Sequence, residues 1–275
     1  MKKIQIITSI VFLTLFISCS SEEEEPNNTE ENTDTVFVGD VLLTTQQEVD
    51  EFGANNYLII DGNLEIRNNS NTITNLNSLS SITTVNQTFI IADNRGLENL
   101  NGLNNLSNAG KLSIFENSIL TLEGLENLNS VEGSLQIYEN DELNNLSAIS
   151  NVNSVGGLLI EENPSLGTIS GLQNLISVSG GIRISENPSL TTIEPTGMIN
   201  DLSVLVIFKN NSLNNLDGFV NINSLNQTLN VIDNMVLSDL CGLQTALSNN
   251  PSVGVTISGN QNNPSQQEIS NGNCN

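Results

Sequence analysis

The 275-residue sequence contains no histidine, no tryptophan and only three cysteines. Without histidine, the chain lacks the commonest general base of enzymes and the commonest protein ligand of transition metals. Basic residues are also scarce, since seven lysines and arginines stand against 31 aspartates and glutamates. The resulting net charge of -24 repels the phosphates of nucleic acid, so no nucleic-acid partner is expected.

The first residues have the features of a secretion signal. Two lysines precede an apolar run at 4–17, which is too short to span a bilayer but suits a signal peptide. The stretch "FISC" at 16–19 resembles the lipobox of bacterial lipoproteins. Residues 1–18 are therefore predicted to be a lipoprotein signal peptide, with Cys19 as the lipidated residue. The alternative is an ordinary signal peptide in which the cysteine occurs by chance.

Residues 19–35, "CSSEEEEPNNTEENTDT", are predicted to form an acidic disordered tether. No large apolar residue occurs there, so the segment cannot bury enough surface to fold. Its glutamate run resembles the export signal of surface-displayed lipoproteins in some Gram-negative bacteria. We therefore expect the protein to be lipid-anchored in the cell outer membrane and to face the cell exterior. The alternative is a charged spacer on an anchor that faces the periplasm.

A sequence repeat fills the rest of the chain. Nine copies of the pattern apolar-x-apolar-x-x-Asn recur every 23 to 26 residues, beginning at Leu64, Phe89, Leu112, Leu135, Leu158, Ile182, Leu205, Leu229 and Val255. Each copy is too short to hold a core alone, and its period of two is typical of a strand. The repeat predicts an all-β fold over residues 36–275, in which about nine coils stack as parallel strands and share one core.

Two further rows of recurring residues are predicted to be structural. The motif asparagines are expected to bond backbone groups at a corner of each coil: Asn69, Asn94, Asn117, Asn140, Asn163, Asn187, Asn210, Asn234 and Asn260. Glycines recur at another corner, where a missing Cβ permits a tight bend: Gly102, Gly124, Gly171, Gly218 and Gly242. Neither row is predicted to bind a ligand.

Both ends of the solenoid are expected to be covered by short helices. The stretches "TQQE" at 45–48 and "SQQE" at 265–268 place Glu three residues after Thr or Ser, which is the signature of a capping box. We predict an N-terminal cap at 36–56 and a C-terminal cap at 260–275. Cys241 and Cys274 are predicted to form a disulfide that fastens the second cap, because the chain is exported and neither cysteine has zinc-site spacing.

The repeat resembles the receptor L-domain family. The resemblance covers residues 55–260 and depends on "GSLQIYENDELNNLSAI", "GGLLIEENPSLGTISGL" and "GGIRISENPSLTTIEPTG". Ordinary leucine-rich repeats usually carry the next leucine two residues after the asparagine, whereas here it falls three after. The resemblance implies a single leucine-rich-repeat-like right-handed β-helix, here in a bacterial surface lipoprotein, and it implies recognition of a protein ligand. It assigns no ligand residues.

The outward positions of the motif suggest a contact surface. The first and third motif residues are predicted to face the core, so the second and fourth face outward. The fourth position places Phe115 and Tyr138 on adjacent copies and Phe208 three copies farther along. Exposed aromatic residues on a rigid face indicate a binding surface. The alternative is that another segment covers them.

The fifth motif position carries a carboxylate in five consecutive copies, at Asp93, Glu116, Glu139, Glu162 and Glu186. Like charges one strand apart repel each other and raise each other's pKa unless solvent or a cation relieves them. Calcium binds such oxygen ligands, but no aspartate-rich loop accompanies the row. A solvated acidic edge is therefore favoured over a calcium site, and no metal or cofactor is predicted.

Catalysis is not predicted. Polysaccharide lyases with a parallel β-helix set a base against acidic clefts, and only Arg95 and Arg183 stand beside carboxylates here. No triad, nucleotide-binding or metalloprotease motif occurs. We predict a lipid-anchored binding or adhesion protein that recognises an extracellular protein or glycan. The alternatives are a structural cell-surface lipoprotein and, less favoured, a lyase. The predicted ligand-binding residues are Phe115, Tyr138, Phe208, Glu116, Glu139, Glu162 and Glu186.

Overall fold

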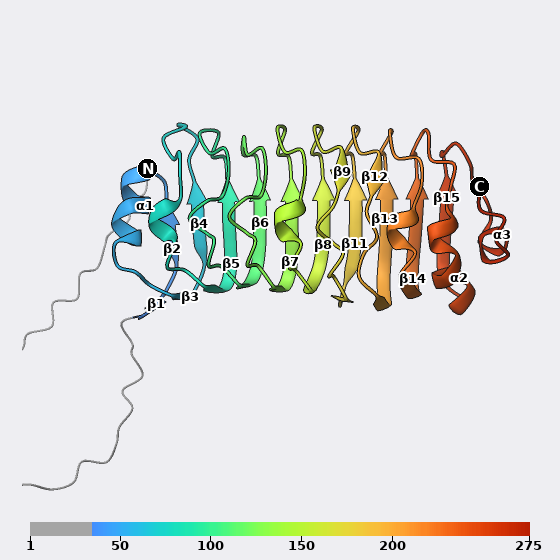
Figure 1. Cartoon of the computed structure of the whole chain (residues 1–275), viewed down its shortest axis with the longest axis horizontal. Coiled ribbons are helices and arrows are strands. Elements are labelled where there is room, and N and C mark those ends of the chain that lie inside the picture. Colours follow the sequence, from blue (N-terminus) through green and yellow to red (C-terminus); the bar gives the residue numbers. More distant parts are fainter. Residues whose placement is uncertain (1–34) are drawn as a thin grey trace, which may run out of the picture. The chain divides into compact units, whose positions relative to one another are not determined.

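One long parallel sheet dominates the computed structural model, which describes residues 35–275 (Figure 1). The predicted signal peptide, Cys19 and the tether up to residue 34 lie outside the described residues. The sheet has 13 strands: β1 (Val36–Val38), β2 (Val41–Leu43), β3 (Ile59–Asp61), β4 (Leu64–Arg67), β5 (Thr84–Ala92), β6 (Asn108–Phe115), β7 (Ser130–Tyr138), β8 (Ser154–Glu161), β10 (Ser177–Val178), β11 (Gly181–Ser185), β13 (Ile199–Phe208), β14 (Ile222–Ile232) and β15 (Gly254–Ser258).

The strands follow one another across the sheet in the order of the repeats, and every pair is parallel. The observed register joins equivalent motif residues, as in Leu112 to Leu135 and Leu135 to Leu158. A second, two-stranded sheet pairs β9 (Thr168–Ile169) with β12 (Thr192–Ile193). The predicted parallel, solenoid-like repeat architecture is confirmed.

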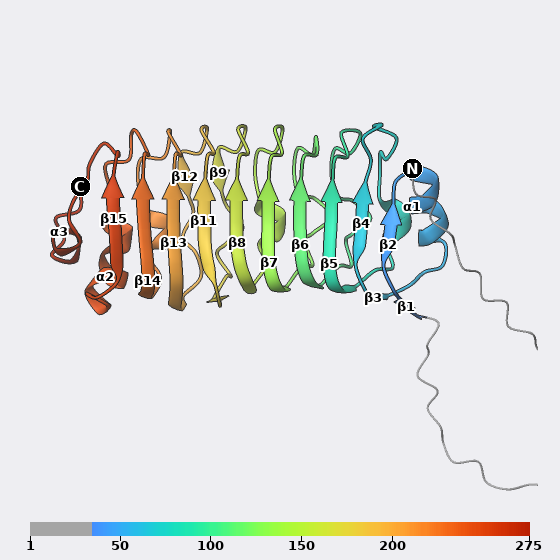
Figure 2. The ribbon, with the colours of Figure 1, turned by 180° about the vertical axis from the view of Figure 1, so that it is seen from behind.

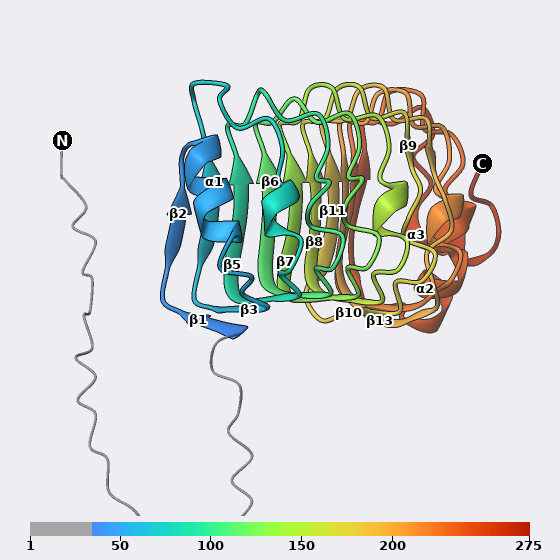
Figure 3. The same cartoon turned by 60° about the vertical axis from the view of Figure 1, so that its left-hand side comes forward.

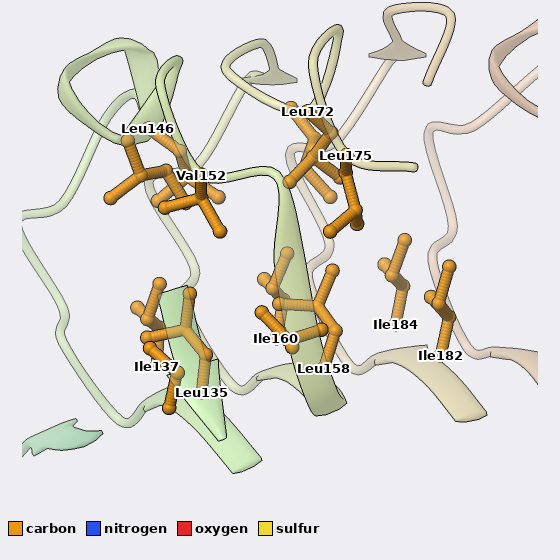
Figure 4. Close-up of a cluster of buried hydrophobic side chains, with 14 of the residues drawn as sticks. Leu135, Ile137, Leu146, Val152, Leu158, Ile160, Leu172, Leu175, Ile182 and Ile184 are labelled. Atoms are coloured by element: carbon orange, nitrogen blue, oxygen red, sulfur yellow. The ribbon is translucent and has the colours of Figure 1, made fainter. Parts of the chain in front are cut away.

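The core lies between the sheet and an opposite wall of apolar residues. In β7, Leu135 and Ile137 are buried, whereas Gln136 and Tyr138 are half-buried, as the period of two predicts. Figure 4 shows Leu146 and Val152 of the opposite wall above the side chains of the strands. Since every repeat contributes the same positions, the buried side chains form one continuous cluster along the chain.

The opposite wall contains short helical turns and the recurring glycines. Four 3₁₀ turns occur there: η2 (Asn77–Leu79), η3 (Ser147–Ile149), η4 (Asp217–Phe219) and η5 (Cys241–Leu243). Gly124 has φ of +110°, and a Cβ on it would lie 2.1 Å from the carbonyl oxygen of Leu100 in the preceding repeat. Gly242 lacks a positive φ, yet its Cβ would lie 1.9 Å from the oxygen of Leu216. Close approach between repeats therefore requires these glycines.

The motif asparagines form a buried ladder, as predicted. Asn163 is fully buried, and its side-chain Nδ2 donates to the carbonyl oxygens of Ile137 and Glu161 at 3.0 and 2.9 Å. Its Oδ1 accepts from the backbone N–H of Asn140 at 3.2 Å, which links it to the preceding repeat. The same arrangement recurs from Asn117 to Asn234. Asn94 donates in the same way to the carbonyl of Ile66, but its buried Oδ1 has no hydrogen-bond partner among the described residues.

The predicted ladder position is wrong in the first repeat. Asn68, not Asn69, is buried there, and Asn69 is exposed. The Nδ2 of Asn68 donates to the carbonyl oxygen of Thr44 and to the hydroxyl of Thr72. The carbonyl of Thr44 is within reach because Thr44 directly follows β2 in the preceding repeat. The local partners therefore select the earlier of two adjacent asparagines.

Helices lie at both ends of the described chain (Figure 3). Both predicted capping boxes are formed, by Thr45 and Glu48 at α1 (Gln46–Gly53) and by Ser265 and Glu268 at α3 (Gln266–Ser270). A third helix that the sequence did not lead us to expect, α2 (Gln244–Asn249), packs against β14. No helix among residues 35–275 is long and apolar enough to cross a membrane.

The predicted disulfide is confirmed. Cys241 and Cys274 are bonded to each other, with their Cα atoms 5.0 Å apart. The bond joins the first residue of η5 to the last turn of the chain, and Cys274 is fully buried. The C-terminal segment is thereby attached to the last complete repeats.

Candidate functional site

The candidate site lies where neighbouring strands end side by side. β6, β7, β8, β11 and β13 each end at the fourth motif residue, and their arrowheads form one row in Figure 2. The register places Phe115 beside Tyr138, and Tyr138 beside Glu161. The next two strands add Ser185 and Phe208. The sequence repeat alone therefore lines up these outward side chains.

Phe115 and Tyr138 form a stacked pair. Their ring centroids are 4.6 Å apart and their planes differ by 7°. This separation matches the spacing of about 4.8 Å between adjacent strands. The ring faces are therefore turned toward each other along the row of strands, and the ring edges point away from the sheet. A partner would meet the edges of this pair rather than an open aromatic face.

Arg67 occupies the other side of the pair. Its guanidinium carbon lies 5.6 Å from the centroid of the Phe115 ring, within the range of a cation–π contact. The intervening fourth-position residue, Ala92, is fully buried. Arg67 is also paired with Glu65 at 3.1 Å and with Asp93 at 3.5 Å. No role was predicted for Arg67, although its place in the fourth-position row could have indicated one.

Phe208 does not join the aromatic pair. Glu161 and Ser185 lie between it and Tyr138 in the row of strand ends. These two residues are hydrogen-bonded to each other and to Arg183. Arg183 donates to Oε1 of Glu161 at 2.9 Å, and the Ser185 hydroxyl donates to the same oxygen at 2.7 Å. Phe208 instead contacts Lys209, whose Nζ lies 4.7 Å from the ring centroid.

The two arginines weighed as catalytic groups lie in different surroundings. Arg183 is paired with Glu161 on the outward face of the sheet, and not with Glu162 or Glu186. Arg95 lines a depression beside the acidic row. Arg183 is therefore held by an ion pair, whereas Arg95 lies among the carboxylates that line the depression.

The acidic row occupies a special backbone conformation. Glu116, Glu139, Glu162 and Glu186 all have φ between +53° and +55°. Residues other than glycine, asparagine and aspartate rarely adopt this left-handed region, which costs about 1–2 kcal/mol per residue. The same motif position has positive φ in the neighbouring repeats too, at Asp93, Lys209, Asp233 and Gly259, and the aspartates and the glycine are the sequence signal for it.

The carboxylates of the row influence one another's protonation. A hydrogen bond with Asp93 is the main cause that raises the pKa of Glu116 to about 7; burial and the charges of Asp93 and Glu139 add to it. The pKa of Glu162 is raised by burial and by the charges of Glu139, Glu186 and Glu161. Repulsion between successive repeats, expected from the sequence, thus extends along the row.

Tyr138 is coupled to the same charges. Burial is the main cause that raises the pKa of its hydroxyl, and the charges of Glu139 and Glu116 raise it further, while Arg67 lowers it. The aromatic pair therefore lies close enough to the acidic row for the charges of Glu116 and Glu139 to act on the Tyr138 hydroxyl. We refer to Phe115, Tyr138, Glu116, Glu139 and Glu162 together as the outer-face site.

A depression of about 380 Å³ is lined in part by the glutamates of the outer-face site. Five carboxylates and one arginine line it: Glu116, Glu139, Asp141, Glu142, Glu162 and Arg95. Asp141 and Glu142 were not predicted, although they directly follow a ladder asparagine in the sequence. Their side chains extend the negative charge of the row.

The row does not form a compact metal site. Within residues 35–275, the only three acidic or cysteine side chains whose ligand atoms all lie within 4.8 Å of one another are Asp239, Cys241 and Cys274. The two cysteine sulfurs of this group are bonded to each other. No three carboxylates of the outer-face site come this close to one another, which suits contact with an extended cationic surface better than binding of one desolvated ion.

Comparison of the chain with protein-family models, with curated proteins and with solved structures gives no match.

Proposed function

We propose that the protein is a binding or adhesion module that recognises an extracellular protein or glycan through the outer-face site, with Glu186 and Phe208 extending the contact surface. The rigid parallel sheet would hold these side chains in fixed positions without ordering a loop, which reduces the entropic cost of binding. The acidic row favours a partner that presents basic groups. The proposed role is non-enzymatic and involves no cofactor.

The glutamates in left-handed backbone carry this proposal. Asparagine or glycine would occupy the same positions at a lower conformational cost, as Gly259 does in the last repeat. Four consecutive repeats instead retain glutamate, next to the aromatic pair. The left-handed conformation recurs in every repeat from Asp93 to Gly259 and belongs to the fold, but the fold does not require repelling glutamates there. Strained positions that carry such charges often mark a functional surface.

The finer architecture belongs to the same proposal. We propose that the chain winds as a right-handed β-helix of about nine coils, in the manner of the receptor L-domain family. The repeat motif, the buried asparagine ladder and the parallel register support this assignment. Recognition of a protein ligand is what the resemblance implies, whereas the choice of the outward face rests on the residues of the outer-face site.

Anchoring at the cell surface completes the proposal. The lipobox-like "FISC" and the glutamate run behind it support a lipid anchor at Cys19 in the outer membrane, with the solenoid facing the exterior. Cells given labelled palmitate should incorporate the label into the protein. A Cys19→Ala variant should lose both the label and membrane association, and a variant that stays in the membrane would contradict the anchor. Protease treatment of intact cells tests exposure separately.

A binding screen tests the proposed recognition. The purified chain without its first 19 residues would be applied to glycan and extracellular-matrix protein arrays, with and without calcium. We expect a partner whose binding falls at least about tenfold in a Phe115→Ala/Tyr138→Ala variant, the change expected when two central aromatic contacts are lost. Val220→Ala is the matched control, because it removes an exposed apolar side chain just after η4 on the opposite wall.

Three outcomes would count against the proposal. A partner whose affinity is the same for both variants would place recognition elsewhere on the chain. Absence of any partner would favour a structural surface lipoprotein. Release of sugar products from a polysaccharide would assign the protein to the lyases, and Arg95 and Arg183 would then be the first residues to substitute.

A further inference from the structure

The parallel sheet ends at β15 with an open edge. Within residues 35–275, β15 pairs with β14 on one side, and no strand pairs with its other side. Figure 2 shows β15 as the last arrow of the row, with no further strand beyond it. An uncovered strand edge presents unpaired backbone N–H and C=O groups.

The C-terminal segment completes the asparagine ladder but not the strand. The Oδ1 of Asn263 accepts from the backbone N–H and the side chain of Asn260, both at 3.1 Å. Asn263 thus takes the place of the asparagine that a further repeat would supply. α3 packs against α2 rather than along β15. The cap therefore completes the asparagine corner of the last repeat, but it leaves the edge of the sheet unpaired.

The direction of the free backbone groups follows from the preceding strand. Asp233 is the fifth motif residue, and its backbone N–H donates to the carbonyl of Ser258. The N–H at the fifth motif position therefore points to the following repeat. Successive residues of a parallel strand direct their backbone N–H and C=O groups to opposite neighbouring strands. The backbone groups of Leu229 and Val231, at the first and third motif positions, therefore also point to the following repeat. Their equivalents in β15 are Val255 and Ile257. The N–H and C=O groups of these two residues consequently point to the open edge.

The side chains of the same residues lack a covering repeat. Leu229 and Val231 are fully buried, whereas Val255 and Ile257 are only half-buried. β15 also lacks the usual protection of an edge, because "GVTIS" contains no charge and no proline. The other end differs, since its edge is divided into β1 and β2, strands of three residues each.

Charge and shape decide between the possible occupants. α1 and α3 extend past the terminal strands in Figures 1 and 2, so a second copy could not continue the sheet flush against β15. After Lys209 the chain has no lysine or arginine but keeps Asp217, Asp233, Asp239 and Glu268. All charged side chains of residues 210–275 are therefore negative, which disfavours a second copy and favours a basic partner.

We propose that the free edge of β15 binds an extended segment of a basic partner protein as an additional parallel strand. Its backbone would pair with Val255 and Ile257, its alternate apolar side chains would cover these residues, and its lysines or arginines would face outward. This site is separate from the outer-face site and does not rest on the function proposed for it.

A peptide-binding experiment tests the edge directly. The probe is a fluorescent peptide in which valine and lysine alternate, and the control peptide has the same composition with its lysines grouped at one end. We expect the alternating peptide to bind and to slow hydrogen exchange at the Val255 and Ile257 amides by at least about tenfold. Amides of β14 should be unaffected, since they are already paired.

A matched pair of variants tests the backbone bond. Val255→Pro removes a free N–H without breaking a bond inside the chain, and Val255→Ala keeps that N–H. The proline variant should bind the peptide at least about tenfold more weakly than the alanine variant. Equal binding by both variants, equal binding of the grouped peptide, or unchanged exchange at Val255 and Ile257 would overturn the proposal. Protection that rises with protein concentration without peptide would do so too, by assigning the edge to a second copy.

Discussion

A buried asparagine links each repeat to its neighbours, and its contacts explain why the residue recurs. Asn163 is fully buried and satisfies two carbonyl oxygens and one backbone N–H. A second, exposed asparagine row is also present, in which Nδ2 donates to a carbonyl of the preceding repeat, at Asn105, Asn127, Asn151, Asn174, Asn221 and Asn249. The two rows differ in burial, so they should differ in their contribution to stability.

Asn163→Ala should lower the free energy of unfolding by about 1–3 kcal/mol for each buried group left without a partner. Asn151→Ala is the matched control, because the side chain is exposed and water can replace its bond to Glu126. The control should cost about 1 kcal/mol or less. Chemical denaturation of both variants measures the difference. Equal losses would show that burial of the ladder does not determine its strength.

The carboxyl of Glu116 should make stability depend on pH. Its pKa is raised from an ordinary value of 4.5 to about 7, so between these values the folded chain holds a proton that the unfolded chain has lost. The free energy of unfolding should therefore fall as pH rises from about 4.5 to about 7. Glu116→Gln removes this titration, so the variant should gain stability over the wild type at pH above 7 but not at pH below 4.5. A difference that does not change with pH would contradict the coupling to Asp93.

At the scale of elements, the strands could be predicted because one pattern determines both burial and register. The first and third motif residues must face the core in every repeat, so equivalent residues pair across the sheet. The capping boxes could also be predicted, since each depends on residues only three apart. Local signals of this kind survive in the folded chain because packing and sequence favour the same structure.

Other elements could not be predicted from the repeat. α2 interrupts the repeat pattern, although Leu243, Ala246 and Leu247 have helical spacing and are buried. The choice of Asn68 over Asn69 depends on Thr44 and Thr72, which lie outside the motif. The stacking of Phe115 on Tyr138 depends on side-chain rotation, which spacing along the chain does not determine.

The disulfide should stabilise the C-terminal end as a unit. It joins residues 33 apart, and a loop of this length contributes about 2–4 kcal/mol. A Cys241→Ala/Cys274→Ala variant should lose that amount in denaturant unfolding, and hydrogen exchange should accelerate first in α2 and α3. If the variant unfolds at the same denaturant concentration as the wild type, the bond does not hold the cap in place.

For the whole described chain, the central observation is a division between inward and outward positions. The inward positions keep one pattern from β4 to β15, which gives the sheet its regularity. At the outward positions the residue types differ between repeats. In neighbouring repeats they include the stacked pair Phe115 and Tyr138, beside glutamates in left-handed backbone. The first set accounts for the scaffold, and we attribute the second set to recognition.

Site-specific photo-crosslinking tests this attribution most directly. A photoreactive amino acid would replace Gln136, which lies on the outward face of β7 two residues before Tyr138. A second protein would carry it in place of Ser147, in η3 on the opposite wall. With the partner identified by the array screen, we expect a crosslink from position 136 and none from position 147. A crosslink from position 147 alone would show that the partner does not bind the outer-face site.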